Sequence, residues 1–114
     1  MTLTTFVKRT PQEKARNIVN AVLAYLNAIP EFHAEYEDVG PAVHANIEKI
    51  WERMTVAILI DVMYPEKDIA ITKSLLHDLT HRPGIEQGFF DPMESEDRGQ
   101  LVQDIRGVVA EHLS

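Results

Sequence analysis

The feature that most constrains the fold of this chain is a series of proline-containing helix starts, spaced about one helix length apart. In Thr10-Pro11-Gln12-Glu13, threonine is a good capping residue, proline suits the first helical position and glutamate completes a capping box. Apolar residues then recur at steps of three and four up to Ile29, as on the buried face of a helix. Because Pro30 disfavours helical geometry at the residue before it, we predict a helix over about 11–29.

A longer helix is predicted to begin at Pro41, after an acidic segment, 31–39, that could form one or two helical turns. Its apolar stripe indicates a helix of about 41–64. The β-branched run 56–62 would also suit a strand, but the helical pattern enters it without a break. From Met54 onward apolar residues surround the helix axis, so we expect this end to be the most deeply buried element.

Two further helices are predicted in the C-terminal half of the chain. One covers about 66–82 and ends before Pro83-Gly84. A loop over 85–91 follows, and Asp91-Pro92-Met93-Glu94 then repeats the first start signal, which predicts a helix over about 92–113. Four helices with short connections indicate an all-α protein, folded as a compact bundle or an orthogonal array.

The size and composition of the chain set further limits. Its 114 residues fit one helical domain, 1–114, with a short flexible N-terminal tail over 1–9, and 45% hydrophobic residues are enough for a core. The absence of cysteine excludes disulfides, thiolate catalysis and cysteine-ligated metal centres. The first residues do not show a signal-peptide pattern and no apolar run is long enough to span a membrane, so we expect a cytoplasmic protein without a signal peptide or membrane contact.

The charge of the chain is strongly negative and unevenly distributed. The net charge is −7, yet residues 1–30 carry four basic residues and one acidic residue. The remaining 84 residues therefore hold a net charge of −10. Such a surface repels phosphate backbones, which disfavours direct binding of nucleic acid.

A histidine–aspartate–histidine cluster is the main candidate for metal chemistry. His77 and His81 are four residues apart in a predicted helix, so both imidazoles share a face and could reach one ion. The adjacent Asp78 could supply an oxygen ligand. The alternative is that both histidines are surface residues near a helix C-terminus, where an imidazolium interacts favourably with the helix dipole.

The string Leu75-Leu76-His77-Asp78-Leu79 resembles the central motif of the HD-domain phosphohydrolases. The resemblance implies an all-helical, metal-dependent enzyme that binds its ion through an upstream histidine, the His-Asp pair and a distant aspartate. His44 stands where the upstream histidine would be expected. Asp97 and Asp104 are the available stand-ins for the distant aspartate, and no flanking motif accompanies either.

Three carboxylates of the predicted 41–64 helix form a second candidate set. Glu48 and Glu52 could contribute to a two-metal site, but the glutamate-x-x-histidine motif that normally accompanies one is absent. Beside Lys49 and Arg53, they are more typical of a solvated face with ion pairs. Asp61 lies inside the most apolar run, so we expect it to pair with an arginine, a histidine or a backbone donor, or to face water.

The segment Gly88-Phe89-Phe90 is the candidate binding loop. Two consecutive phenylalanines cannot both face inward from a regular helix, so we expect one in the core. The other is either an exposed interface anchor or also tucked under the loop. Acidic clusters at 31–38 and 91–97 complete the candidate interface, whose residues are Phe89, Phe90, Asp91, Met93, Glu94, Glu96 and Asp97 together with Glu35, Glu37 and Asp38.

These patterns favour a small acidic, non-enzymatic interaction protein, a regulator or inhibitor that covers the surface of a partner protein. The partner would carry a basic surface, and the apolar stripes indicate a homodimer. No cofactor is expected. The competing interpretation is a metal-binding or metal-dependent, phosphohydrolase-like protein that uses His77, Asp78 and His81, with His44, to hold a divalent ion.

Overall fold

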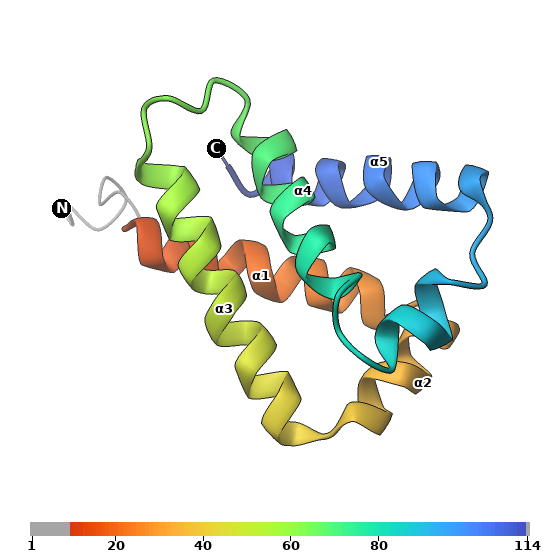
Figure 1. Ribbon diagram of the computed structural model, residues 1–114. Helices are drawn as coiled ribbons and strands as arrows, with labels where there is room; N and C mark the ends of the chain where they lie inside the picture. The colour runs from red at the N-terminus through yellow and green to blue at the C-terminus, as the bar shows by residue number, and fades with distance from the viewer. Residues whose placement is uncertain (1–9, 114) are drawn as a thin grey trace, which may run out of the picture.

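The computed structural model describes residues 10–113 and consists, over this range, of helices and connecting turns without a strand (Figure 1). The prediction of an all-α protein is therefore confirmed for these residues, whereas the predicted tail over 1–9 lies outside them. The elements, in chain order, are α1 (Pro11–Asn27), α2 (Pro30–Val39), α3 (Pro41–Ile60), α4 (Lys67–Leu79), the π-helical segment η2 (Glu86–Phe90) and α5 (Ser95–Glu111).

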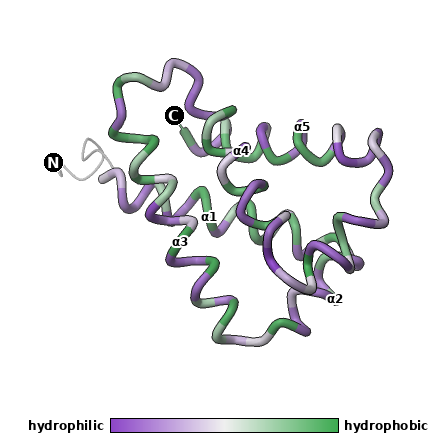
Figure 2. The backbone as a smooth tube through the Cα atoms, in the orientation of Figure 1, coloured by the Kyte–Doolittle hydropathy of each residue, from purple (hydrophilic) through white to green (hydrophobic). Residues whose placement is uncertain are grey.

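Four of these helices enclose the core. The helix α1 packs against α3 and α5, and α4 packs against the same two helices. At one end of the molecule α2 packs against η2, whereas the connection between α3 and α4 lies at the opposite end (Figure 1). The result is an elongated body of 52 × 29 × 23 Å. Hydrophobic and hydrophilic residues alternate along the helices, as expected when each buries one face (Figure 2).

The first helix follows its sequence signal closely. The hydroxyl of Thr10 accepts a hydrogen bond from the backbone N–H of Glu13 at 3.1 Å, and Pro11 occupies the first turn. The helix ends two residues earlier than predicted, because Ile29 is extended and serves as the N-cap of α2. The acidic segment that follows forms a complete ten-residue helix rather than one or two turns.

The predicted 41–64 helix begins at Pro41 but ends at Ile60, and its apolar end is exposed. The exposed fractions are 62% for Ile60, 92% for Val62 and 80% for Met63, so the expectation of a deeply buried end is wrong. The buried part lies in the middle of α3, where Trp51 is fully enclosed. Ile58 in the last turn is still buried, at 6% exposed, and Leu59 packs against the core, whereas Ile60 and the connection to α4 face solvent. The reason is tertiary: the core covers only the inner side of this turn.

Asp61 ends α3 instead of standing in its apolar interior. Its backbone is extended, and its Oδ1 accepts a hydrogen bond from the N–H of Met63 at 2.8 Å. The ammonium of Lys67 donates to the carbonyl oxygens of Ile58 and Asp61, at 2.9 and 2.6 Å. Of the partners expected for the Asp61 side chain, the structure therefore shows a backbone donor. The bonds from Lys67 satisfy carbonyl oxygens that the end of α3 leaves without a helical partner.

The last two predicted helices are shorter than expected. The helix predicted over 66–82 is α4, and the one predicted over 92–113 begins only at Ser95, with Glu94 as its N-cap. Asp91 is not the predicted N-cap of α5 but the C-cap of η2, because its backbone stays helical and its N–H donates to the carbonyl of Glu86. None of the helices in the described part of the chain is long and apolar enough to cross a membrane.

An ion pair fastens α5 to α4. The Nε of Arg106 lies 2.8 Å from Oδ2 of Asp68, and this hydrogen bond lowers the pKa of Asp68 below its usual value. Both side chains are partly exposed, so the pair orients the two helices more than it stabilises them.

Candidate functional site

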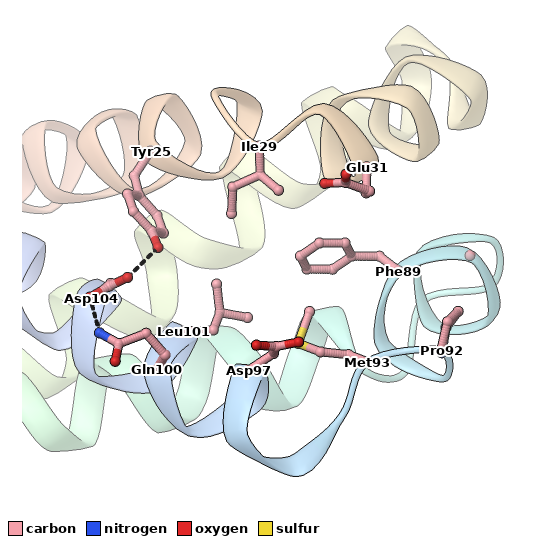
Figure 3. Close-up of a pocket in the computed structure, with 11 residues that line it drawn as sticks. Tyr25, Ile29, Glu31, Phe89, Pro92, Met93, Asp97, Gln100, Leu101 and Asp104 are labelled. Atoms are coloured by element: carbon pink, nitrogen blue, oxygen red, sulfur yellow. Dashed lines mark hydrogen bonds between the residues drawn. The ribbon is translucent and has the colours of Figure 1, made fainter.

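A cleft of about 450 Å³ opens where the end of α1 and the start of α2 face η2 and the first half of α5 (Figure 3). Apolar side chains and carboxylates share its surface. The apolar lining consists of Ile29, Phe89, Pro92, Met93 and Leu101, and the polar lining of Tyr25, Glu31, Asp97, Gln100 and Asp104, with Gly88 beside them. None of these described lining residues is basic, so the cleft is electrostatically negative.

Helical spacing explains how these side chains meet. Tyr25 lies in the last turn of α1 and Ile29 at the junction between α1 and α2, and both face the cleft (Figure 3). On α5, Asp97, Leu101 and Asp104 follow at steps of four and three, which places them along one side of the helix. The cleft is therefore built from two helix faces that lie far apart in the sequence.

A short hydrogen-bond chain fixes one wall of the cleft. The hydroxyl of Tyr25 donates to Oδ2 of Asp104 at 2.8 Å, and the amide of Gln100 donates to Oδ1 of the same residue at 2.8 Å (Figure 3). Burial of the phenol, the hydrogen bond and the negative charge of Asp104 together raise the pKa of Tyr25 to about 12. The wall thus keeps a neutral phenol beside a carboxylate.

We expect Asp104→Asn to lower the pKa of Tyr25 while leaving it above 10.0, since burial is the largest of the three causes. NMR titration of the tyrosine ring signals measures this value. Because folding raises the pKa, the contribution to stability is complete below pH 10 and is lost as the pH rises towards 12. A pKa near 10.0 for Tyr25 in the unmodified protein would contradict the proposed wall.

The two consecutive phenylalanines are both buried, with exposed fractions of 6% for Phe89 and 5% for Phe90. Their rings make an edge contact at 5.0 Å, and Phe89 makes another with Phe32 at 5.3 Å. The interpretation of an exposed anchor is therefore wrong, and the alternative in which both are tucked in holds. Both rings can be enclosed because η2 packs against α2, whose Phe32 contacts Phe89, while Phe90 belongs to the same buried cluster.

The structure divides the acidic residues singled out in the sequence. Asp97 lines the cleft, and Glu35 is half-buried with its carboxylate over the backbone of Gly88, where a side chain would collide with it. Five others are exposed: Glu37 and Asp38 at the end of α2, Asp91 and Glu94 between η2 and α5, and Glu96 in the first turn of α5. The two acidic clusters, separate in sequence, each contribute one residue to the cleft, Glu31 and Asp97.

The sequence indicated only part of the cleft. Glu31, Phe89, Met93 and Asp97 belong to segments predicted to bind, and Asp104 was considered only as a possible metal ligand. The lining residues that the sequence did not connect with any site are Tyr25, Ile29, Gln100 and Leu101. The available signal was weak: Tyr25 is a polar residue at helical spacing beside the apolar stripe of α1.

Asp78 is occupied by structural contacts between α3 and α4. Its Oδ2 accepts hydrogen bonds at 2.8 Å from the indole N–H of Trp51 and from Nε of Arg82, and its Oδ1 accepts from Nη2 of Arg82 at 3.3 Å. The same arginine also donates to the side-chain oxygen of Asn46 on α3 at 2.9 Å. This network satisfies the polar atom of Trp51, the largest fully buried side chain in the described core.

The proposed metal ligands do not form one cluster, although two of the histidines are neighbours. His77 and His81 are exposed, with ring centroids 4.4 Å apart, and Nδ1 of His81 bonds the carbonyl oxygen of His77. His44 stacks on Tyr36 at 3.9 Å and bonds its carbonyl oxygen. Within residues 10–113, no three histidine, aspartate or glutamate side chains form a group that could hold a metal ion.

The second carboxylate set lies on the outer face of α3. Glu48 is exposed, and Glu52 forms an ion pair with Arg16 of α1 at 3.6 Å. This arrangement is the solvated, charge-paired face that the sequence indicated.

Comparison with known proteins adds no assignment: no family model, no curated protein and no solved structure matches this chain.

Proposed function

We propose that this protein is a small non-enzymatic interaction protein that binds a basic, amphipathic segment of a partner protein in its acidic cleft. The observation that carries the proposal is the composition of the cleft, in which an apolar floor is combined with three carboxylates and no basic residue. The apolar floor would accept an aliphatic or aromatic side chain, and the carboxylates would select for lysine or arginine beside it.

The positions of the carboxylates support this preference. Glu31 and Asp97 are exposed and approach the cleft from opposite sides, one on α2 and one on α5 (Figure 3). The remaining acidic residues around this end extend the negative field beyond the cleft, and the net charge of −7 would steer a basic partner towards the protein. Covering the surface of such a partner is the action of a regulator or inhibitor.

The metal-dependent alternative has less support. It needs Asp78 as a ligand, whereas that carboxylate is held by Trp51 and Arg82. The interaction protein is therefore the function that the geometry supports.

A direct test uses a fluorescent amphipathic peptide of lysine and leucine, with a glutamate and leucine peptide of the same length as the probe control. We expect the lysine peptide alone to bind, with an affinity that falls as salt is raised. The double variant Glu31→Gln/Asp97→Asn should weaken binding by about tenfold, because it removes both cleft-edge charges. Fluorescence anisotropy measures both affinities.

The matched control is Glu66→Gln/Glu111→Gln, which removes two exposed charges at the other end of α4 and α5. It should leave the affinity nearly unchanged. Equal weakening by the two double variants would show non-specific attraction to an acidic protein, and would overturn the assignment to the cleft.

A further inference from the structure

The end of α3 and the connection to α4 expose apolar side chains in an unusual concentration. Ile60, Val62 and Met63 are neighbours in the chain, and most of each side chain faces solvent. Among the large hydrophobic residues of the described chain, the only exposed one outside residues 60–64 is Val102, at 38%. A contiguous patch of this kind on a folded protein commonly marks a surface that another molecule covers.

The patch continues into a shallow groove of about 590 Å³ along the outer face of α3. The groove is lined by Gln12 of α1 and by residues of α3: Ala45, Glu48, Lys49, Glu52, Arg53, Val56, Ala57 and Ile60. Its apolar members lead directly to the exposed end of the helix. This face shares no residue with the acidic cleft, so it calls for an explanation of its own.

The charges along the groove are balanced, in contrast to the rest of the chain. Glu48 and Glu52, four residues apart, lie along one edge of the α3 face, and Lys49 and Arg53 lie along the other. Their charges cancel, although the whole chain carries −7. Two copies of so acidic a protein repel each other over most of their surfaces, and this face is one where they can meet without that repulsion.

We propose that a second copy of this chain packs on this face, with the two α3 helices side by side and parallel. A two-fold axis along the helices places the acidic edge of one copy opposite the basic edge of the other, as in parallel helix pairs. The same axis brings the two exposed connections together, so that Val62 and Met63 of each copy are covered by those of its partner. One arrangement thus satisfies both the charges and the apolar patch.

An antiparallel arrangement satisfies neither feature. It would place the edge with Glu48 and Glu52 against the same edge of the partner, and like charges in contact disfavour association. It would also separate the two apolar connections by about the length of α3, roughly 30 Å for a helix of 20 residues. The ion pair between Arg16 and Glu52 is exposed and weak, and it is compatible with the parallel arrangement.

Light scattering on the full chain, over a range of concentrations, tests the dimer. We expect a dimeric mass for the unmodified chain and at least a tenfold weaker association for Ile60→Lys, which places a charge in the apolar centre of the contact. The matched control Val102→Lys, also at an exposed apolar residue, should remain dimeric. Because both sites are exposed, both variants should keep the helical circular dichroism, and only Ile60→Lys should lose the part of the melting temperature that dimerisation provides. A monomeric mass at every concentration, or a dimer unaffected by Ile60→Lys, overturns the proposal.

The absence of cysteine allows a test of orientation. In the parallel dimer the two Met63 positions lie close to the axis, so Met63→Cys should form an intermolecular disulfide under mild oxidation. Val102→Cys should not. Cross-linking through Val102→Cys in preference to Met63→Cys would overturn the parallel arrangement. The α3 face and the acidic cleft share no residue, so the two proposals are tested independently. A failure of the lysine-peptide experiment would not contradict the dimer, and a monomeric mass would not contradict peptide binding in the cleft.

Discussion

Replacing Phe90 with alanine is expected to lower the free energy of unfolding by about 3–5 kcal/mol, the range found when a buried aromatic side chain is truncated. The Phe90 side chain is only 5% exposed and packs edge-on against Phe89, so its removal leaves a cavity under η2. For a domain of this size, such a loss is a large fraction of the total stability. Urea denaturation followed by circular dichroism measures it.

The exposed Val102 provides the control for this experiment. Val102→Ala removes an apolar side chain of α5 that is 38% exposed, and it should change the free energy of unfolding by no more than about 0.5 kcal/mol. Phe90 does not line the cleft. Under conditions in which the Phe90→Ala variant is folded, it should therefore bind the lysine peptide with the affinity of the unmodified protein. A variant of unchanged stability that had lost peptide binding would restore the interpretation of Phe90 as an interface anchor.

Replacing Asp78 with alanine is expected to lower the free energy of unfolding by about 2–4 kcal/mol. The change leaves the indole N–H of the fully buried Trp51 without its acceptor and removes the carboxylate partner of Arg82. Trp51 is the only tryptophan, so its fluorescence reports the local change and the unfolding transition together.

A double-mutant cycle isolates the bond between these two side chains. Trp51→Phe removes the indole donor, so Asp78→Ala should be less damaging in that background than alone. His77→Ala, at an exposed position on the same helix, is the matched control and should have little effect. A loss below about 1 kcal/mol for Asp78→Ala would show that Asp78 does not hold α3 to α4, and would leave it free for the metal-dependent alternative.

Helix starts were predicted better than helix ends. Pro11 and Pro41 each begin a helix where the sequence indicated, because a start depends on a few adjacent residues and their local hydrogen bonds. Asp91-Pro92 carries the same signal and does not begin a helix, because the preceding π-helical turn extends to Asp91 and holds it in helical geometry. The end of α3 was misplaced because nothing in its apolar sequence specifies where α4 turns back.

The candidate site was predicted only in part for a related reason. The sequence indicated two acidic clusters and the Phe89-Phe90 segment, but the cleft also requires Tyr25 to meet Asp104, which lies 79 residues away in the chain. The role of Asp78 likewise depends on Trp51, 27 residues earlier and on another helix. Such pairs depend on how the helices cross, and patterns of three or four residues carry no information about crossing angles.

The sequence by itself determined that this chain forms helices, where two of them begin, and that its negative charge gathers beyond the first helix. These properties follow from capping, periodicity and composition, all of which act over a few residues. Only the tertiary structure decided that both phenylalanines of η2 are buried, that the apolar end of α3 is exposed, and that two acidic segments contribute to one cleft. The physical reason is that burial depends on which helix faces pack together, and each face can be covered only by residues distant in the chain.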